Sequence, residues 1–343
     1  MPSLHQYPLP YSVNLFITNL CNRKCPFCYL SDWVTNNQSA ANHMNINAIR
    51  IVIRWLKRSR IEKVKLAGGE PMLHPNLIEI VNELVKNNII VDGILTNGLG
   101  KSELYKEVAD ITGSNWLVNI TKPNTYTNNE WKLLNENLEL LRWKNENRSV
   151  KSYGFDATSL RHLCFSITFY QPNQEYKYII ELAKKYECPV IRYDVSRPSS
   201  IKNNAYIDSN LLAMKPVLME FVKSCVNEGI KPGLDDALPL CIFTQKELMF
   251  LHLFSNFYTI CLPHSDVMPD LSVEYCTSLR GIFPSYKVGD KTADQMFKEL
   301  FQFANKYRVF QLEHCQNCYN YERRLCQGYC LRFKFDQLKK AKN

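Results

Sequence analysis

The sequence lacks long hydrophobic runs and any N-terminal targeting pattern. No stretch of its 343 residues approaches the roughly 18 consecutive apolar residues of a membrane-spanning helix. The N-terminus has no charged segment followed by an apolar one, which is the pattern of a secretory signal. These absences predict a cytoplasmic protein without a membrane partner. The hydrophobic content of 45% is ordinary for a globular chain, and the length predicts two domains or one large domain with an extension.

The sequence also lacks a recognised nucleic-acid-binding motif. Its net charge of +9, from 42 Lys and Arg against 33 Asp and Glu, permits an anionic partner such as a phosphate, an RNA or an acidic peptide. Basic residues are spread along the predicted helices, with concentrations at residues 50–60 and 334–342. We therefore predict no nucleic-acid partner. An RNA-modifying enzyme, suggested by charge alone, would show salt-sensitive RNA binding.

Signals for disulfide formation are missing as well. The chain has 13 cysteines, an odd number, and no secretion signal accompanies them. Clustered cysteines in such a context are typical of metal ligation rather than of disulfides. Cys188 and Cys225 lie outside the clusters and are interpreted as buried thiols.

Three of the cysteines, Cys21, Cys25 and Cys28, follow a strand-like run at residues 13–18 with the spacing C-x3-C-x2-C. So short a loop can direct three thiolates at one point. A 4Fe–4S cluster has four irons, and three cysteines leave one of them without a protein ligand, as a catalytic metal site requires. The alternatives are a zinc site or an electron-transfer cluster. Zinc usually takes four protein ligands in paired spacing, and the nearest spare ligand, His43, lies well downstream.

With the aromatic Phe27 before its third cysteine, this loop resembles the signature of radical S-adenosylmethionine (SAM) enzymes. In that family the open iron binds SAM through its amine and carboxylate. A second motif, Gly68-Gly69-Glu70-Pro71, follows a strand-like run at residues 64–67. The two glycines let a backbone approach a ligand closely, and the Glu70 carboxylate is predicted to receive an ammonium group. The resemblance implies that this segment holds the amine of SAM.

The chain alternates between predicted strands and helices. Strands are predicted at residues 13–18, 64–67, 89–96, 116–121, 162–169 and 190–195, and helices at 46–57, 77–87, 103–110, 130–143 and 175–186. Six βα repeats predict a parallel sheet with helices outside, either doubly wound or an incomplete barrel. The resemblance favours the partial (β/α)6 TIM-like barrel of radical SAM enzymes. On barrels the chemistry lies at the carboxyl ends of the strands, where both motifs fall.

Three polar residues at later strand ends are candidate SAM contacts. Asn97 lies in a Thr-Asn-Gly turn that resembles a turn near SAM in the family, although an Asn-Gly turn after a strand is common in any protein. Asn119 occupies a position where many relatives carry a Ser-(Leu/Ile)-Asp-Gly segment, and it is a candidate for the SAM ribose. Ser166 is predicted to face the cofactor from the fifth strand.

Three further residues are candidates for catalysis. Cys164 shares one strand face with Ser166 because of the period of two, so an inward thiol is a candidate hydrogen-atom donor; the alternative is a packed free cysteine. Arg192 and Asp194 share the polar face of the sixth strand. They are candidates for contacts with the substrate or the SAM carboxylate, or else for a structural ion pair.

The C-terminal part is rich in cysteine. Seven cysteines follow a helix-like segment at residues 209–228: Cys241, Cys261, Cys276, Cys315, Cys318, Cys326 and Cys330. A predicted β-hairpin at residues 267–273 lies between the second and the third of them. This region resembles the SPASM/twitch extension of radical SAM enzymes, which binds one or two auxiliary 4Fe–4S clusters. We predict a barrel at residues 1–200, a helical connection at 201–240 and a SPASM/twitch-like domain at 241–343.

The extension departs from the family in three ways. The cysteine run from Cys315 to Cys330 has a longer spacing, the glycine usual in the hairpin is missing, and no cysteine follows Cys330. The resemblance assigns one auxiliary cluster to Cys241, Cys261, Cys276 and Cys330. It leaves an incomplete second site on Cys315, Cys318 and Cys326. One alternative is a single cluster on Cys261, Cys276, Cys315 and Cys318. Another is a zinc site on the last four cysteines.

The resemblance implies the following chemistry. The Cys21/Cys25/Cys28 cluster receives an electron from a donor of the flavodoxin or ferredoxin type. SAM is then cleaved to methionine and a 5′-deoxyadenosyl radical, which removes a substrate hydrogen, while the barrel positions the reactants and excludes water. An auxiliary cluster accepts an electron from the product radical or binds substrate.

The leading prediction is an enzyme that oxidises or crosslinks side chains of a ribosomally made peptide or protein. Its rival is radical oxidation or rearrangement of a small natural-product or cofactor precursor. A noncatalytic iron–sulfur electron carrier is the alternative of another class. Only twenty residues precede Cys21, too few for a leader-peptide-binding domain. Either the substrate is not a peptide, or the barrel or a separate precursor-peptide-binding protein presents it.

Overall fold

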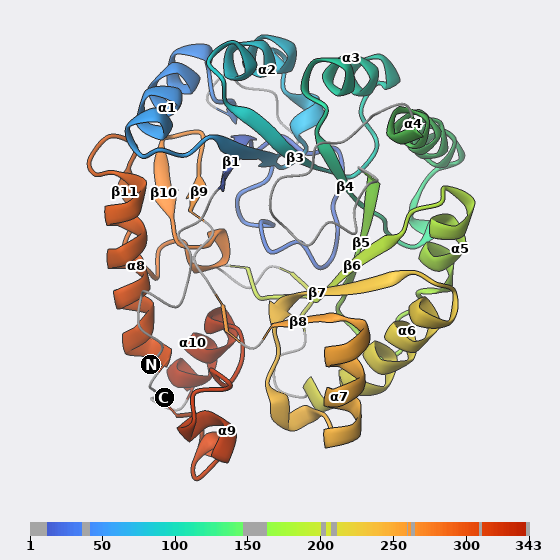
Figure 1. Ribbon diagram of the computed structural model, residues 1–343, viewed down its shortest axis with the longest axis vertical. Helices are drawn as coiled ribbons and strands as arrows, with labels where there is room; N and C mark the ends of the chain where they lie inside the picture. Colours follow the sequence, from blue (N-terminus) through green and yellow to red (C-terminus); the bar gives the residue numbers. More distant parts are fainter. Residues whose placement is uncertain are drawn as a thin grey trace.

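The fold is organised around one long, mostly parallel sheet with helices on its outer side. The computed structural model describes residues 12–35, 42–146, 163–199, 204–206, 211–258, 260–261, 265–308 and 311–340. Eight strands form the parallel part: β1 (Ser12–Thr18), β2 (Lys63–Gly68), β3 (Ile90–Thr96), β4 (Asn115–Asn119), β5 (Leu163–Phe169), β6 (Val190–Val195), β7 (Lys231–Ala237) and β8 (Asn256–Tyr258). They are hydrogen-bonded in chain order and curve into an open arc (Figure 1).

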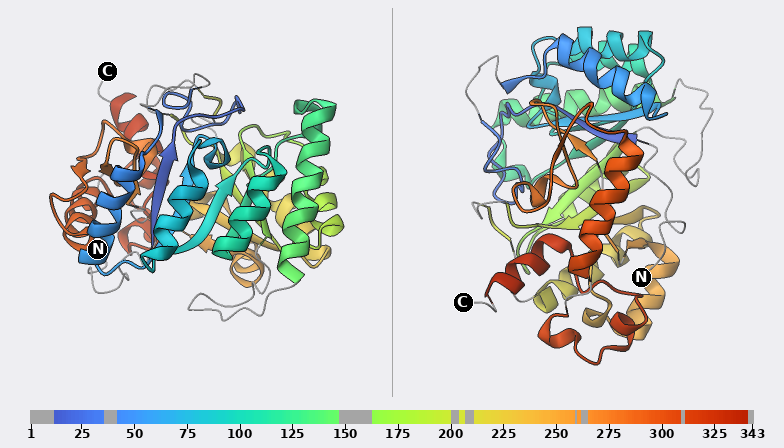
Figure 2. Two further views of the ribbon diagram at one scale, coloured as in Figure 1. Left: turned by 90° about the horizontal axis from the view of Figure 1, so that it is seen from above. Right: turned by 90° about the vertical axis from the view of Figure 1, so that its left-hand side faces the viewer.

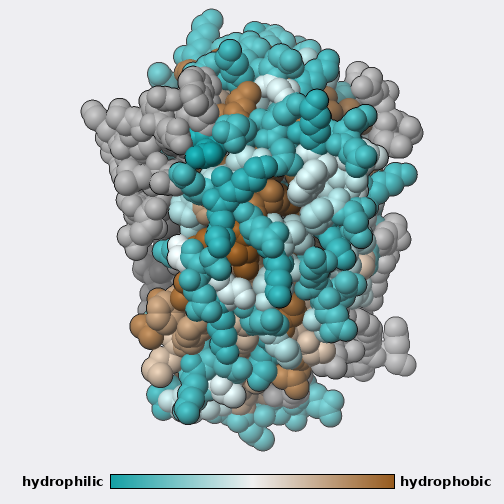
Figure 3. Space-filling model, turned by 90° about the vertical axis from the view of Figure 1, so that its right-hand side faces the viewer, coloured by the Kyte–Doolittle hydropathy of each residue, from teal (hydrophilic) through white to brown (hydrophobic). Residues whose placement is uncertain are grey.

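The helices cover the outside of this arc. They are α1 (Ile46–Arg58), α2 (Leu77–Lys86), α3 (Ser102–Thr112), α4 (Asn128–Glu146), α5 (Lys177–Lys185), α6 (Lys215–Asn227) and α7 (Gln245–Phe254). Helix α1 shows why such segments fold: its buried residues, among them Ile49, Val52 and Leu56, recur at helical spacing, and the Asn45 side chain caps its first turn. The face that carries α4, α5 and α6 is dominated by hydrophilic side chains, as expected for amphipathic helices (Figure 3).

The partial barrel of βα repeats predicted from the sequence is confirmed. Each of the six predicted strands corresponds to one of β1–β6, with small shifts at the ends. The predicted start of the fifth strand, His162, lies outside the described residues. The sheet also continues further than predicted. The segment at residues 201–240, expected to be a helical connection, contains β7, which pairs in parallel with β6.

The C-terminal part adds to the other edge of the same sheet. Strand β9 (Asp266–Val267) pairs in parallel with β1, and β10 (Ser272–Glu274) and β11 (Tyr286–Lys287) follow it antiparallel. The predicted hairpin is therefore confirmed. Leu271 takes φ 63° in its turn, the left-handed conformation that the missing glycine would adopt without strain.

Three helices complete the C-terminal part: α8 (Ala293–Arg308), α9 (Tyr319–Glu322) and α10 (Leu331–Lys340). They lie on the open side of the arc, with α8 next to the β9–β11 strands (Figures 1 and 2). No helix of the described residues has the length and apolar character needed to span a membrane.

The inner face of β1 and β2 carries a small apolar cluster that supports the cysteine loop. Phe16 and Ala67 are buried there with Leu30 and Met268, and Cys28 and Trp33 pack against them. Alternate residues of β1, such as Leu15 and Ile17, belong to the main core instead. The period of two along the strand therefore separates the core under the helices from the floor of the cysteine loop.

Candidate active site

The three N-terminal cysteines lie in a loop closed on itself at the carboxyl end of β1. The Cys21 N–H donates to the Thr35 carbonyl (2.9 Å), and the Thr35 N–H donates to the Asn19 carbonyl (2.9 Å). The Cys28 N–H donates to the Cys25 carbonyl (3.1 Å) and forms a turn within the loop. All three thiols are half-buried. The loop therefore presents three cysteines from one short, hydrogen-bonded segment.

The Gly68-Gly69 pair fixes the start of this loop against β2. The Gly69 N–H donates to the Thr18 carbonyl (2.8 Å), and the Glu70 N–H donates to the Leu20 carbonyl (2.7 Å). A Cβ at Gly68 would lie 2.4 Å from the Thr18 carbonyl oxygen, and one at Gly69 would lie 2.4 Å from the Leu20 carbonyl oxygen. Two glycines are required here because the backbones touch.

The Glu70 side chain has a different place from the one predicted. It is fully buried, and its carboxylate accepts hydrogen bonds from the N–H of Met72 (3.1 Å), the Thr96 hydroxyl (2.7 Å) and the N–H of Asn97 (2.6 Å). Burial raises the pKa of Glu70 to about 7 in spite of these three donors. The carboxylate is thus occupied in holding the end of β3 next to β2, and it does not lie open to receive an ammonium group.

The burial of Glu70 makes a pH-dependent contribution to the free energy of unfolding, and this contribution can be measured. The folded protein keeps the Glu70 proton up to about pH 7, whereas the carboxyl ordinarily loses it near 4.5. Folded protein therefore binds more protons than unfolded protein between these values, and the free energy of unfolding falls as the pH rises through them. As the pH rises through this window, the free energy of unfolding of wild type should fall by up to about 3 kcal/mol more than that of the Glu70→Gln variant.

The measurement compares Tm values of the two anaerobically reconstituted proteins at pH 5 and pH 8. All other titratable groups are the same in the two proteins, so their effects cancel when the two Tm changes are compared. Wild type is expected to lose more Tm than the variant on going to pH 8. Equal losses in the two proteins would contradict the assignment.

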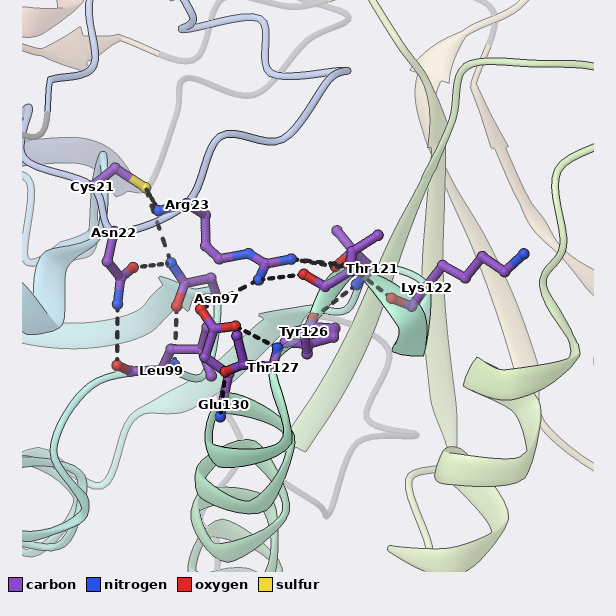
Figure 4. Close-up of polar contacts among 11 residues, drawn as sticks. Cys21, Asn22, Arg23, Asn97, Leu99, Thr121, Lys122, Tyr126, Thr127 and Glu130 are labelled. Carbon is purple, nitrogen blue, oxygen red and sulfur yellow. Dashed lines mark hydrogen bonds and ion pairs between the residues drawn. The ribbon is translucent and has the colours of Figure 1, made fainter.

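Residues between the first two cysteines attach the loop to β3 and β4 (Figure 4). The Asn22 amide donates to the Leu99 carbonyl (3.2 Å) and accepts from the Asn97 amide (2.8 Å). The Asn97 amide also approaches Cys21 Sγ at 4.0 Å. Asn97 therefore faces the cysteine loop, and its predicted contact with SAM stays a prediction.

Arg23 is the strongest connection between the loop and the end of β4. Its guanidinium donates to the Thr121 hydroxyl and to the hydroxyl and carbonyl of Thr125, each at 3.0 Å. It also lies 4.3 Å from the centroid of the Tyr126 ring and 3.6 Å from a Glu130 oxygen (Figure 4). Five donors in a rigid fork suit Arg to this multiple contact. Sequence reasoning missed Arg23, and its place between two cysteines was the available signal.

The third cysteine is held from the end of β6. The Ser196 hydroxyl and the Asn204 amide both donate to the Phe27 carbonyl (3.1 and 3.2 Å), and the Ala205 N–H donates to the Pro26 carbonyl (2.6 Å). The cysteine loop is thus bonded to groups at the carboxyl ends of β2, β3, β4 and β6. Such convergence at one edge is a property of parallel strands.

The electrostatics of the three thiols fit an iron–sulfur cluster. Burial raises the pKa of Cys21 to about 11 and that of Cys28 to about 12, and it also raises the pKa of Cys25. Mutual repulsion between the thiolates raises the values of Cys21 and Cys28 further. The Arg23 N–H donates to Cys21 Sγ (3.4 Å). Three close thiols that cannot all ionise alone are suited to bind a cationic metal centre.

The distances required between ligands differ for a single metal ion and for a cluster. Within the parts of the chain that the structure describes, no three His, Cys, Asp or Glu side chains lie close enough to hold one metal ion. A 4Fe–4S cluster bridges thiolates that are farther apart than the ligands of one ion. The zinc alternatives at the N-terminal loop and at the last four cysteines stay predictions.

A cavity of about 490 Å³ lies directly beside the cysteine loop. The loop contributes Cys25 and Phe27 to its wall, the end of β4 contributes Thr121, and the end of β5 contributes Thr168 and Tyr170. The Phe27 and Tyr170 ring centroids are 5.6 Å apart. The cavity has both apolar walls and hydrogen-bonding groups, as small-molecule sites do.

The candidate residues on β4 and β5 lie next to each other inside the arc. The Asn119 amide donates to the Ser166 hydroxyl (3.5 Å), so both side chains are on the predicted face. Cys164 is on this face too, and burial raises the pKa of its thiol to about 11, with Arg192 opposing the rise. Its role as a hydrogen-atom donor stays a prediction.

Of the two charged residues of β6, Arg192 takes part in an ion pair, one of the alternatives considered above. Arg192 donates to Asp235 of β7. Asp194 is buried, and burial raises its pKa although Arg192 and Arg197 oppose this. Its Oδ1 has no hydrogen-bond partner within the described residues. The arc therefore encloses a strongly polar group of side chains at β5–β7.

The C-terminal cysteines form two groups in space. Burial raises the pKa of Cys276 to about 12, and Asp266 and Cys261 raise it further while Arg197 opposes. Cys261 packs against the apolar cluster that contains Cys276 and Leu331. We call Cys261 and Cys276 the proximal thiols.

The second group, which we call the distal thiols, consists of Cys241, Cys315, Cys318 and Cys326. Burial raises the pKa of Cys241 and of Cys315, and neighbouring thiols of the same group raise both further. These interactions weaken with distance, so they identify neighbours. Cys241 thus has Cys318 and Cys326 as neighbours, and its predicted assignment to a cluster with Cys261, Cys276 and Cys330 stays a prediction.

Tyr29 lies between the cysteine loop and the proximal thiols. Its ring centroid is 4.7 Å from the guanidinium carbon of Arg197. Burial raises the pKa of Tyr29, Arg197 opposes this, and charges on Asp266, Cys276 and Cys28 add to the rise. This half-buried side chain thus has both a cysteine of the N-terminal loop and a proximal thiol as neighbours.

The comparisons with known proteins agree with this geometry. The family model described as the Radical SAM superfamily matches residues 15–195, from within β1 to the end of β6. This is more than half of the chain, and the chain belongs to the Radical SAM superfamily.

Two solved structures have the same fold over nearly the whole chain. Streptococcus suis SuiB bound to precursor peptide SuiA aligns with a TM-score of 0.62 and 15% identity over 94% of this chain and 72% of that chain. Native anSMEcpe with bound AdoMet aligns with a TM-score of 0.65 and 15% identity over 96% of this chain and 94% of that chain.

A curated relative matches a shorter part. The probable GTP 3',8-cyclase of Methanocaldococcus jannaschii is 28% identical over 99 residues, which is 29% of this chain and 32% of that protein. The match thus spans about a third of the length of this relative.

Proposed function

We propose that this radical SAM enzyme modifies a side chain of a peptide or protein by hydrogen-atom abstraction. The chemistry rests on one observation: the loop with Cys21, Cys25 and Cys28 is hydrogen-bonded to four strand ends and adjoins a cavity of about 490 Å³. In this proposal the three thiolates hold a 4Fe–4S cluster. When bound, the cluster supplies the electron that cleaves SAM to methionine and a 5′-deoxyadenosyl radical.

The side chains around the loop have two tasks. Arg23, Asn97 and Ser196 hold the loop at fixed distances from the strand ends, so the thiolates stay where the cluster binds. The cavity walls, formed by Phe27 and the ends of β4 and β5, enclose the adenosyl group and exclude water from the radical. In this proposal Asn119 and Ser166, whose side chains are hydrogen-bonded to each other, contact the ribose.

The aromatic wall of the cavity gives a testable consequence. Phe27→Ala removes a ring that lines the cavity and packs against Tyr170. An aromatic contact is worth about 1.4 kcal/mol, so KM for SAM should rise about tenfold, with a smaller effect on kcat. Steady-state formation of 5′-deoxyadenosine measures both constants. Phe27→Tyr is the matched control, since it keeps the ring, and equal KM values for both variants would contradict the placement.

Two features support a peptide or protein substrate. The fold likeness to SuiB, which was solved with a precursor peptide, extends over 94% of this chain and so includes the cysteine-rich C-terminal part. The proximal thiols also lie close to the N-terminal loop through Tyr29. We propose that the C-terminal part is SPASM/twitch-like and that its auxiliary clusters accept the electron of the product radical. We further propose two partners. An external protein of the flavodoxin or ferredoxin type donates the electron, and a separate protein binds and presents the peptide.

A second candidate is a small phosphorylated substrate. It rests on the relative named as a probable GTP 3',8-cyclase, which matches 29% of this chain. The net charge of +9 also suits an anionic substrate.

One experiment separates the two candidates. The anaerobically reconstituted full chain is incubated with SAM and a strong reductant, and with either GTP or synthetic peptides that contain serine and cysteine. Formation of 5′-deoxyadenosine coupled to loss of two hydrogen atoms from a peptide supports the proposal. Consumption of GTP coupled to 5′-deoxyadenosine would replace the peptide substrate by the small-molecule one. No SAM cleavage under any condition would refute both.

A further inference from the structure

Two polar atoms on one face of β6 are buried without a hydrogen-bond partner among the residues that the structure describes. One is Nε of Arg192, a donor, and the other is Oδ1 of Asp194, an acceptor. Arg192 uses its Nη2 for the bond to Asp235 and leaves Nε unused. Asp194 is only 7% exposed, so bulk water has little access to it. Buried donors and acceptors without partners are rare because they are costly, and here one of each lies on the same strand face.

This face of β6 is the one that meets the cysteine loop. Tyr193 belongs to the main core under the helices, so Arg192, Asp194 and Ser196 share the opposite face, inside the arc. The Ser196 hydroxyl donates to the Phe27 carbonyl of the loop (3.1 Å). Two residues along a strand span about 6.6 Å. Asp194 therefore lies one such step from the residue that holds the cysteine loop.

The strands on either side leave room beside the two side chains. Gly233 of β7 is in register with Arg192, and a Cβ added to Gly233 would meet nothing within 4 Å. On the other side, Thr168 of β5 is in register with Asp194 and lines the cavity of about 490 Å³ beside the cysteine loop. Register partners present their side chains on the same face of a sheet. The inside of the arc is thus open next to Arg192, and Asp194 adjoins the wall of the cavity.

The charges of this site favour a neutral group that both donates and accepts. A phosphate would meet repulsion from the carboxylates of Asp194 and Asp235, and an ammonium group would meet repulsion from the Arg192 guanidinium. A peptide backbone is neutral and offers one N–H and one C=O per residue. In an extended chain the N–H and C=O of the same residue point to the same side. One extended residue can therefore serve both unpaired atoms.

We infer that Arg192 and Asp194 bind the backbone of a peptide substrate: Arg192 Nε donates to the carbonyl oxygen of one extended residue, and Asp194 Oδ1 accepts from the N–H of that residue. The inference rests on the proposed function, because it names the part of the peptide that the barrel holds. Binding of the backbone one strand step from Ser196 places a neighbouring side chain near the cysteine loop, where the proposed radical forms. The pair positions the substrate and does not itself react.

The probe is a pool of synthetic hexapeptides with acetylated N-termini, amidated C-termini and a central serine or cysteine. Its members contain no lysine, arginine or histidine and so carry no cationic group. The pool is mixed with the anaerobically reconstituted full chain and SAM without reductant, and retained peptides are identified by mass spectrometry after ultrafiltration. The best-retained peptide is then synthesised with one backbone amide at a time replaced by an ester, which removes one N–H. Calorimetry gives the Kd of each peptide.

Wild type should retain members of the pool. One ester analogue should bind about tenfold more weakly than the parent peptide, because it lacks the N–H that Asp194 accepts. Asp194→Ala should weaken binding of the parent by a similar factor and should bind the parent and that ester equally. Asp194→Asn keeps an acceptor oxygen and should bind the parent better than Asp194→Ala. Arg192→Lys keeps a charge for Asp235 but has no Nε, so it should also lose about tenfold.

Asp92→Ala is the matched control. Asp92 is a strand carboxylate near the amino end of β3 and forms an ion pair with Lys63 (4.0 Å), so its loss should leave the Kd of the peptide unchanged. The Tm and iron content of every variant show whether the chain folds and holds its cluster. SAM retained in the same samples is also measured, because the charged side chains of β6 were candidates for contact with the SAM carboxylate.

Three results would overturn the inference. Wild type retains no member of the pool, which would leave water as the partner of the two atoms. Asp194→Asn loses as much affinity as Asp194→Ala, which would indicate a cationic group of the substrate instead of an amide. SAM is lost together with the peptide in Asp194→Ala and Arg192→Lys, which would assign the pair to SAM. Failure of the proposed function is a separate result, because retention is measured without reductant and does not depend on SAM cleavage.

Discussion

Replacing Cys28 by alanine should abolish the reductive cleavage of SAM. The three cysteines of the N-terminal loop are the thiolates proposed to hold the cluster, and the loop that carries them is bonded to four strand ends. With two thiolates the cluster is not retained. The rate of 5′-deoxyadenosine formation should fall by at least about a thousandfold, which corresponds to about 4 kcal/mol of barrier.

Cys225→Ala is the matched control for this variant. Its thiol is fully buried in the core under α6, so its loss costs stability through packing but removes no metal ligand. Both variants are assayed anaerobically with SAM and a strong reductant, and iron is counted in parallel. Retention of a tenth or more of the wild-type rate by Cys28→Ala would show that this thiol is not a required ligand.

Gly69→Ala should destabilise the protein and weaken cluster binding together. The added Cβ would lie 2.4 Å from the carbonyl oxygen and 2.7 Å from the carbonyl carbon of Leu20. Both atoms belong to the backbone that leads into Cys21, so the strain cannot be relieved by rotating a side chain. Overpacking of this kind costs about 1–3 kcal/mol. The Tm should fall by several degrees, and the iron content after reconstitution should fall with it.

Gly233→Ala is the control for Gly69→Ala. Gly233 lies in β7, a Cβ there would meet nothing within 4 Å, and its backbone is not in the left-handed region. Alanine is tolerated better than glycine in a strand interior, so this variant should keep or slightly raise the Tm. Similar Tm values for Gly69→Ala and Gly233→Ala would mean that the backbone of the cysteine loop yields easily at Leu20.

The repeating pattern of the chain was sufficient for the central fold. Strands β1 to β6 and the helices between them follow from local hydrophobic periodicity, because each buries one face within its own segment. The cysteine spacing and the Gly68-Gly69 pair were equally local signals. The fold prediction failed where signals were weak: β7 includes Pro232 and Gly233, which are unusual in strands, and β8 to β11 have two or three residues each.

The role of Glu70 shows a second kind of limit. The glutamate after two glycines at a strand end was predicted to receive an ammonium group. The structure buries it completely against Thr96 and the Asn97 N–H. The hydrogen-bond partners come from the next strand, so no pattern within the Gly68–Pro71 segment could reveal them.

The sequence by itself determined the class of fold and the identity of the three cysteines of the N-terminal loop, because periodicity and short spacing are properties of neighbouring residues. The tertiary structure alone decided how the loop is held, through Arg23 and Ser196, and which C-terminal thiols are neighbours. Cys241 and Cys326 are 85 positions apart in sequence. Their proximity depends on where the end of β7 and the turn around α9 meet, and this is set by the packing of the whole chain.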